Sequence, residues 1–339
     1  MSTKTDQRHH PPEAAKNEAT ESDHGREAKT PAEVPPRGWW DILVRTKNEL
    51  GSDNLSIVAA GVAFYCFLAF VPTLGAVISI YALAADPKTV SDNLSALTRV
   101  MPPEIMPVIN EQISRLVAES QTAGIGAAIS LLLALYGGSK AAKALMEGLN
   151  IAYDEKEKRG FFRLLLTALL LTLGAVLGAV LAIGLVAVLP VALRNLRLGS
   201  VAETLATWLR WPILMGGFMV ALGILYRYAP CRDEPKWRWV SWGAALGTGL
   251  WVAGSALFSL YVSSFGNYDK SYGSLGALVI FLFWLYLTGY AVLIGAELNS
   301  EMERQTFRDT TKGPEQPMGA RGAHSADTVG PDASGSSAA

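Results

Sequence analysis

Histidine is absent from the apolar body of this chain. The four histidines all lie in its polar terminal stretches: His9, His10, His24 and His324. No imidazole is therefore available in that body for general base catalysis or for metal binding. The sequence also has no glycine-rich phosphate loop followed by lysine, and no serine within a G-x-S-x-G elbow. We therefore expect a protein that is not an enzyme and that has no metal and no cofactor.

Cysteine is scarce as well. Cys66 and Cys231 are the only two, and they lie far apart in the sequence. Neither their number nor their spacing predicts a disulfide framework or a metal site. We interpret both as small buried hydrophobic residues.

Charge is the third scarcity. Only 17% of the residues are charged and 50% are hydrophobic, and the mean hydropathy is +0.25. The charges gather at both ends and in a few short loops, which leaves long apolar stretches that a soluble fold would have to bury on all sides. The net charge of -1 also excludes the strongly basic surface that nucleic acid requires. The composition predicts an integral membrane protein that binds no nucleic acid.

Long uncharged runs take the place of charge. Residues 271–296 form 26 uncharged residues in a row. As a helix they would measure about 39 Å, enough to cross the ~30 Å hydrocarbon core of a bilayer with some tilt. Similar runs elsewhere predict an all-α integral membrane protein with six transmembrane helices. The predicted spans are about 56–80, 120–140, 164–190, 210–228, 240–264 and 272–297.

Both ends of the chain differ from this body. Residues 1–36 and 305–339 are polar and have few large apolar side chains. Such segments bury too little surface to offset the entropy lost on ordering. We expect two disordered tails on either side of a six-helix transmembrane domain at 37–304.

Basic residues predict the orientation of that domain. Sixteen Lys and Arg fall in or near the segments that six spans place on the side of the two tails, against seven on the other side. Because short cytoplasmic loops are enriched in Lys and Arg, we expect both termini in the cytoplasm.

Small residues recur at helical spacing in two of the spans. Gly174 and Gly178 lie four residues apart in the third span, and Gly243 and Gly247 lie four apart in the fifth. Such rows let a second helix approach closely. We expect helix packing there, and the rows also offer faces for a homo-oligomer.

Glu297 directly follows the uncharged run of the last span. A carboxylate at that depth favours a fixed partner, and the predicted topology places Arg227, Lys140 and Lys143 on the same side. These four residues are candidates for a substrate path or gate. The alternatives stay open: Glu297 as a solvated helix end, and the two lysines as ordinary anchors at the cytoplasmic surface. We expect Glu301 and Glu303 to lie further out, in water.

A kink and a set of aromatic residues are further candidates for a path. Pro72 lies well inside the first span, where it removes one helix hydrogen bond and marks either a packed bend or part of a pathway. Aromatic side chains in the spans could line a route for an amphipathic substrate, or they could serve as packing and interface anchors. The aromatic candidates are Tyr65, Tyr272, Trp284 and Tyr286.

Three segments resemble the YihY/BrkB family of bacterial inner-membrane proteins. They are AFYCFLAFVP, SKAAKALMEGLNIAYDEKEKRGFF and NYDKSYGSLGALVIFLFWLYLTGYAVLIGAELN, and the likeness covers about residues 38–304. The resemblance implies six transmembrane helices in the cytoplasmic membrane of a bacterium. Family names refer to serum resistance and virulence, and members have carried a ribonuclease label.

Members of this family are also suspected of moving lipid-like material. We therefore expect a transporter or lipid-handling factor for an amphipathic, anionic envelope molecule, with membrane lipid as a partner. The alternatives are a non-transporting envelope or virulence factor and, third, a ribonuclease.

Overall fold

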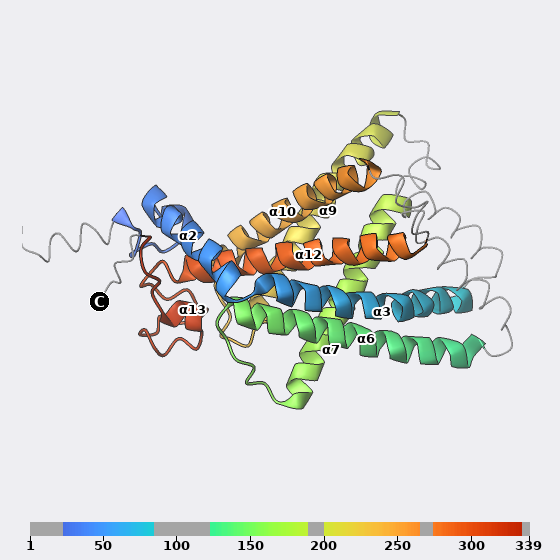
Figure 1. Cartoon of the computed structure of the whole chain (residues 1–339), viewed down its shortest axis with the longest axis horizontal. Helices are drawn as coiled ribbons and strands as arrows, with labels where there is room; N and C mark the ends of the chain where they lie inside the picture. Colours follow the sequence, from blue (N-terminus) through green and yellow to red (C-terminus); the bar gives the residue numbers. More distant parts are fainter. Residues whose placement is uncertain (1–22, 85–122, 189–199, 265–273, 334–339) are drawn as a thin grey trace, which may run out of the picture.

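The computed structural model describes residues 23–84, 123–188, 200–264 and 274–333. The structure is all-α, as predicted, and Figure 1 shows its helices as one elongated bundle. The long helices are α2 (Pro36–Ser52), α3 (Leu55–Ala84), α6 (Ala123–Ala152), α7 (Phe161–Ile183), α9 (Ser200–Tyr228), α10 (Trp237–Ser264) and α12 (Ser274–Glu303). Two short elements, η1 (Pro31–Glu33) and α13 (His324–Asp327), belong to the terminal segments, and a π-helical segment (Gly184–Val188) continues α7.

Long helices cover most of each predicted span. Among the described residues, four stretches are long and apolar enough to cross a membrane: Phe161–Val186, Trp208–Tyr228, Trp237–Val262 and Leu278–Glu303. The pair Pro36–Ser52 and Leu55–Phe70 meets the same test together, but with a bend of 63°. The structure thus gives four to five candidate spans, and the count of six stays a prediction.

Two helices are longer than the uncharged runs that predicted them. The fourth span was expected over 210–228, yet α9 begins at Ser200 and includes Arg210. The guanidinium of Arg210 lies 5.3 Å from the ring centre of Trp211 and is half-buried. In the same way, α6 continues to Ala152, so Lys140 and Lys143 are helical residues. A charge ends an apolar run without ending the helix, because Lys, Arg and Glu are good helix formers.

Close approaches of backbone hold α10 and α12 together near the centre of the bundle. A Cβ at Gly243 would overlap the carbonyl oxygen of Gly295, and a Cβ at Gly247 would lie 2.9 Å from the Tyr226 hydroxyl. Both glycines therefore lie at close contacts between helices. Gly174 and Gly178 differ, because a Cβ on either would meet no atom within 4 Å. Their face of α7 is open in the described chain.

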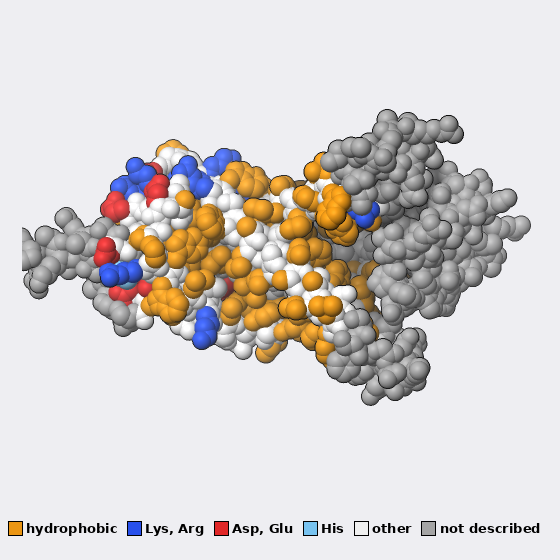
Figure 2. Space-filling model, turned by 90° about the horizontal axis from the view of Figure 1, so that it is seen from above, with side chains coloured by type: hydrophobic (Ala, Val, Ile, Leu, Met, Phe, Trp, Pro, Cys, Tyr) orange, Lys and Arg blue, Asp and Glu red, His pale blue; other side chains and the backbone are white. Residues whose placement is uncertain are grey.

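The buried core lies toward the polar end of the bundle. Its members come from α3, α6, α7, α9, α10 and α12, and the largest of them are Leu55, Met146, Leu149, Tyr153, Tyr226 and Leu293. Elsewhere the apolar side chains point outward, as Figure 2 shows along the flank of the molecule. Most apolar side chains of α7 are exposed, and Ala168 is its described contribution to the core. Exposed apolar flanks of this extent are typical of helices that face lipid.

The predicted disorder of both tails is wrong where the structure describes them, at residues 23–36 and 305–333. Arg26 donates to the carbonyl oxygen of Gly330 at 2.8 Å, and Thr306 donates to the carbonyl oxygens of Arg26 and Ala28. The buried Arg321 donates to the carbonyl oxygens of Phe307 and Ala326, among others. The prediction of disorder from composition failed because it considered only large apolar side chains. These segments are instead held by hydrogen bonds from arginine and hydroxyl groups to backbone carbonyl oxygens.

Candidate functional site: a basic pocket at the polar end

Glu297 lies inside the polar end of the bundle without the partner that we predicted for it. Its side chain is only 2% exposed, and its Oε2 atom has no hydrogen-bond partner among the described residues. The three predicted cations are engaged elsewhere. Lys140 lies over the Tyr136 ring and Lys143 over the Phe161 ring, each with Nζ at 5.6 Å, and Arg227 pairs with Glu234.

The expectation that Glu301 and Glu303 lie in water is also wrong. Both side chains are fully buried. Glu301 pairs with Arg45 and, at 2.6 Å, with Arg304, and Glu303 pairs with Arg232 at 2.6 Å. The terminal segments and α2 cover this end of α12, which no pattern within α12 itself could indicate.

Among the described residues, the predicted path residues lie at separate places in the bundle. Tyr65 is 40% exposed on the outside of α3, and Pro72 is half-buried within that helix. Trp284 donates from Nε1 to the Ser255 hydroxyl at 3.2 Å, and Tyr286 stacks on the next aromatic ring of α12. Tyr272 lies outside the described residues. Packing is therefore the better interpretation of Trp284 and Tyr286.

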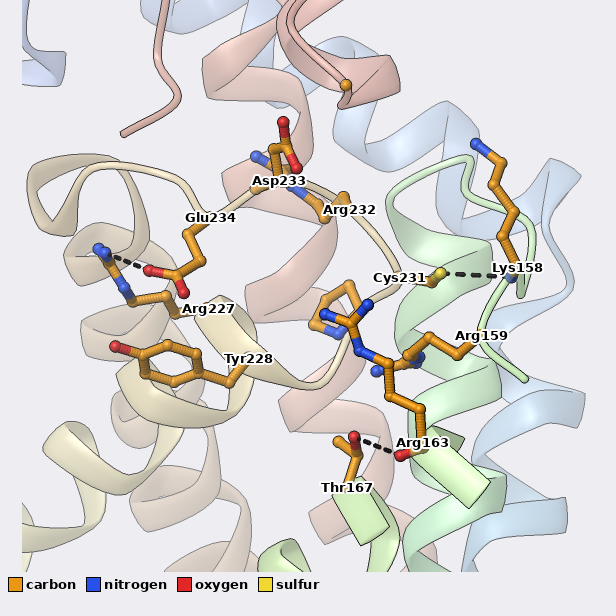
Figure 3. Close-up of a pocket in the computed structure, with 12 residues that line it drawn as sticks. Lys158, Arg159, Arg163, Thr167, Arg227, Tyr228, Cys231, Arg232, Asp233 and Glu234 are labelled. Atoms are coloured by element: carbon orange, nitrogen blue, oxygen red, sulfur yellow. Dashed lines mark hydrogen bonds and ion pairs between the residues drawn. The ribbon is translucent and has the colours of Figure 1, made fainter. Parts of the chain in front are cut away.

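A pocket of about 420 Å³ opens at the polar end, between two loops that are distant in sequence. One side is the α6–α7 loop with the first turns of α7, and the other is the end of α9 with the α9–α10 loop (Figure 3). Its lining residues are Lys158, Arg159, Arg163, Thr167, Arg227, Tyr228, Pro230, Cys231, Arg232, Asp233, Glu234 and Gly322. Only Arg227 of these was a predicted site residue.

Local interactions hold the two loops against each other. Asn150, near the end of α6, accepts a hydrogen bond from the backbone N–H of Cys231 at 2.7 Å. Arg159 pairs with Glu157 at 2.6 Å and donates to the carbonyl oxygen of Ala229 at 2.9 Å. Hydrogen bonds from Arg159 lower the pKa of the Glu157 carboxyl to about 2. The loop pair is thus a built structure, with charged groups fixed by specific partners.

Positive charge dominates the lining. It contains five cations, Lys158, Arg159, Arg163, Arg227 and Arg232, and two acids, Asp233 and Glu234. Two of the arginines are deeply buried: Arg232, whose side chain is 0% exposed, pairs with Glu303, and Arg227, 4% exposed, pairs with Glu234. Neither carboxylate satisfies its arginine completely. Arg227 Nε and Arg232 Nη1 are buried donors with no acceptor in the described chain.

Exposed aromatic and apolar residues flank the pocket. Tyr228 lines it directly and is 44% exposed, and its ring meets that of Trp237, which is 50% exposed. Phe161 and Phe162 begin α7 and are largely exposed. Aromatic side chains of this kind concentrate at the boundary between membrane and water. The pocket is therefore placed where a ligand can put a charged group on arginines and an apolar part along α7.

The sequence feature that marks this site is the density of basic residues in two loops, which by itself predicts only that the loops are cytoplasmic. Basic residues are dense in 156–163 and again in 227–238. We counted them as cytoplasmic anchors, and nothing in the sequence indicates that the two loops meet.

Fold and site together define a multi-pass helical membrane protein with a basic pocket at one end. A family model described as Virulence factor BrkB matches residues 46–319, and the chain belongs to this family. The resemblance in the sequence is thereby confirmed.

Relatives of similar length agree with this membership. The chain is 28% identical to the ribonuclease-like protein YfkH of Bacillus subtilis, over 73% of this chain and 90% of that protein. It is 26% identical to a UPF0761 membrane protein of Idiomarina loihiensis, over 74% and 87% of the two chains. It is 29% identical to one from Pseudoalteromonas translucida, over 80% and 88%. No solved structure matches the chain.

Proposed function

We propose that this protein is a transporter or lipid-handling factor of the bacterial inner membrane, acting on an amphipathic, anionic envelope molecule. In this proposal both termini and the pocket face the cytoplasm, because the basic loops that line the pocket are those that the positive-inside rule assigns there. Membrane lipid is the partner class.

One observation carries the proposal: the basic pocket opens beside a helix whose apolar side chains are mostly exposed. Five cations line the pocket, and α7, which begins at Phe161, buries Ala168 against the bundle while Leu166, Leu170, Leu173 and Leu177 are exposed. A site for a soluble anion would need only the basic pocket, and a scaffold protein would need neither the basic pocket nor the exposed apolar helix. An amphipathic anion uses both, since its charge can pair with arginine while its chains stay in the bilayer.

Reconstitution in vesicles tests this proposal. Full-length protein is placed in vesicles that contain a fluorescent anionic phospholipid, and a membrane-impermeant reductant bleaches the label in the outer leaflet. Lipid movement would expose the inner-leaflet label to the reductant. Protein-free vesicles and a fluorescent neutral lipid are the controls. Bleaching that stops at the outer leaflet with the wild-type protein would contradict transport and favour the non-transporting virulence factor.

A ribonuclease is the competing enzymatic proposal, and the name of the relative YfkH suggests that activity for YfkH. We propose that the present chain does not cleave RNA, because the four histidines lie in the terminal stretches and the pocket lining has no histidine. Purified protein incubated with labelled RNA should leave it intact. Cleavage that co-purifies with the protein and disappears on substitution of one pocket residue would overturn this.

The open glycine face of α7 supports a second partner proposal, a homo-oligomer. Gly174 and Gly178 have free space above their Cα atoms, as a close helix–helix contact requires. Gly174→Leu should shift the cross-linked species in membranes toward monomer. An unchanged cross-linking pattern would count against this face.

A further inference from the structure

We propose that the pocket binds a phosphate group, with the buried Arg227 and Arg232 as its anchors and the exposed Arg163 as a third contact. This rests on the proposed function for the identity of the ligand's apolar part, but the phosphate assignment depends on the pocket alone.

The first support is the two unsatisfied guanidinium donors. Arg227 gives one nitrogen to Glu234 and another to the carbonyl oxygen of Pro235, and its Nε remains without an acceptor. Arg232 gives Nη2 to Glu303, and its Nη1 remains without one. Buried polar groups in folded proteins are nearly always hydrogen-bonded. Both residues line the pocket, and an oxyanion bound there supplies the missing acceptors once the two guanidinium groups turn toward it.

The second support is the surplus of cations at the opening. Arg163 is exposed and forms no ion pair with any residue in the described ranges, and Lys158, 74% exposed, reaches Glu155 only at 3.8 Å. Arginine presents several donors in a planar fork that matches phosphate oxygens. A neutral sugar or amide would leave these charges uncompensated, so an anion with several oxygens fits better.

The start of α7 adds to the same field. Its N-cap, Gly160, provides no side-chain cap, and its first turn has no acidic residue. The first N–H groups of a helix carry a partial positive charge that favours anions. Arg163 belongs to this turn, and Thr167, one turn further, also lines the pocket. Together with the unsatisfied arginine donors, this helix start makes the α7 side of the pocket suited to phosphate, whereas the two acids of the lining, Asp233 and Glu234, lie on the α9–α10 loop.

Size limits what else enters. Ligand pockets in proteins usually measure roughly 300–1,000 Å³, and this one measures about 420 Å³. It accommodates a headgroup but not two acyl chains, which would lie outside along α7 and beside Tyr228. A phospholipid headgroup and a free phosphate share the chemistry of the charged end, and an experiment separates them.

Native mass spectrometry of the full chain in detergent measures the binding. Phosphatidylglycerol is titrated in one arm, diacylglycerol of the same chains in a second, and inorganic phosphate in a third. We expect phosphatidylglycerol to bind and diacylglycerol not to bind. Binding of inorganic phosphate with the same dependence on the arginines would assign the site to free phosphate. Equal binding of phosphatidylglycerol and diacylglycerol would overturn the proposal.

Three variants test the residues. Arg163→Gln should weaken binding roughly ten-fold, which corresponds to one charge-assisted hydrogen bond. Arg227→Lys keeps the charge opposite Glu234 but removes Nε–H, so it should weaken binding similarly without unfolding the protein. Lys47→Gln, an exposed lysine of α2 outside the pocket lining, is the matched control and should bind as wild type does. Wild-type binding by both arginine variants would refute the assignment.

The same variants separate this inference from the proposed function. Arginine-dependent phosphate binding without lipid movement in vesicles leaves the phosphate site standing and removes transport. Wild-type binding together with wild-type lipid movement in Arg163→Gln and Arg227→Lys leaves transport standing and removes this site.

Discussion

Glu303→Gln removes the negative charge from an ion pair that lies wholly inside the polar end of the protein. The side chains of Glu303 and Arg232 are both 0% exposed, and Nη2 lies 2.6 Å from Oε2. The Thr310 hydroxyl donates to the same carboxylate oxygen at 2.6 Å. The substitution keeps the size of the side chain, so any effect comes from the charge and its hydrogen bonds.

The expected magnitude follows from the burial of Arg232. Its guanidinium lies 4.7 Å from the Tyr153 ring centre, and Glu303 is its only ion-pair partner in the part of the chain that the structure describes. Loss of one partner of a buried pair leaves a buried charge uncompensated, which costs about 3–5 kcal/mol of unfolding free energy. An exposed glutamate in water would cost less than about 0.5 kcal/mol. A measurement of stability can distinguish the loss expected for a buried ion pair from the loss expected for an exposed glutamate.

Thermal unfolding in detergent, followed by size-exclusion fluorescence, measures the difference. Glu315→Gln is the matched control, because Glu315 is exposed in the C-terminal segment that follows α12. At about 2–4 °C per kcal/mol for a domain of 150–250 residues, the loss at Glu303 corresponds to a shift on the order of 10 °C. A melting temperature for Glu303→Gln equal to that of Glu315→Gln would refute the buried pair.

Three further predictions concern orientation, the last span and acid stability. Cysteines placed at Arg159 and Lys312 should be shielded from a membrane-impermeant thiol reagent in intact cells, and labelling of either would overturn the cytoplasmic assignment. Glu297→Gln should abolish lipid movement with little change in melting temperature, because Glu297 Oε2 has no hydrogen-bond partner among the described residues. Glu301→Gln should lower the melting temperature, because it breaks two ion pairs. Normal lipid movement with a lowered melting temperature in Glu297→Gln would remove Glu297 as a functional residue. Arg159 holds the pKa of Glu157 at about 2, below its ordinary 4.5, so the stabilisation from this pair is complete above pH 4.5 and is lost as the pH falls toward 2. Glu157→Gln should therefore lack this part of the acid unfolding transition. An acid unfolding transition identical to that of the wild type would argue against the pair.

The fold class was predictable from the sequence because it depends on local composition. A run such as 271–296 has to be satisfied by its own backbone hydrogen bonds in a bilayer, so it has to be helical. The close-packing role of Gly243 was predictable for the same reason, since the row of small residues lies on one helix. The open space at Gly174 shows the limit: the same local pattern does not say whether a partner helix is present.

Burial by distant segments was not predictable from single patterns. Glu301 and Glu303 carry charge just beyond an apolar run, which reads as a return to water. They are buried because Arg45 of α2 and Arg232 of the α9–α10 loop pair with them. Those arginines lie far away in the sequence, and a charge pattern does not indicate which opposite charges meet. The pocket was not predictable for the same reason: the residues that join its two sides, Asn150 and Cys231, lie far apart in the sequence.

The polar end is best understood as one connected structure, in which the terminal segments help to shape the pocket. The backbone N–H of Asp233 donates to the carbonyl oxygen of Gly322 at 3.0 Å, and Gly322 itself lines the pocket with a φ of +69°. Lys312 Nζ lies 3.5 Å from the Glu234 oxygen that also receives Arg227. The C-terminal segment therefore shares the carboxylate that positions a pocket arginine. This contribution to the surroundings of Arg227 is small, because Lys312 is 69% exposed and water screens its interaction with Glu234.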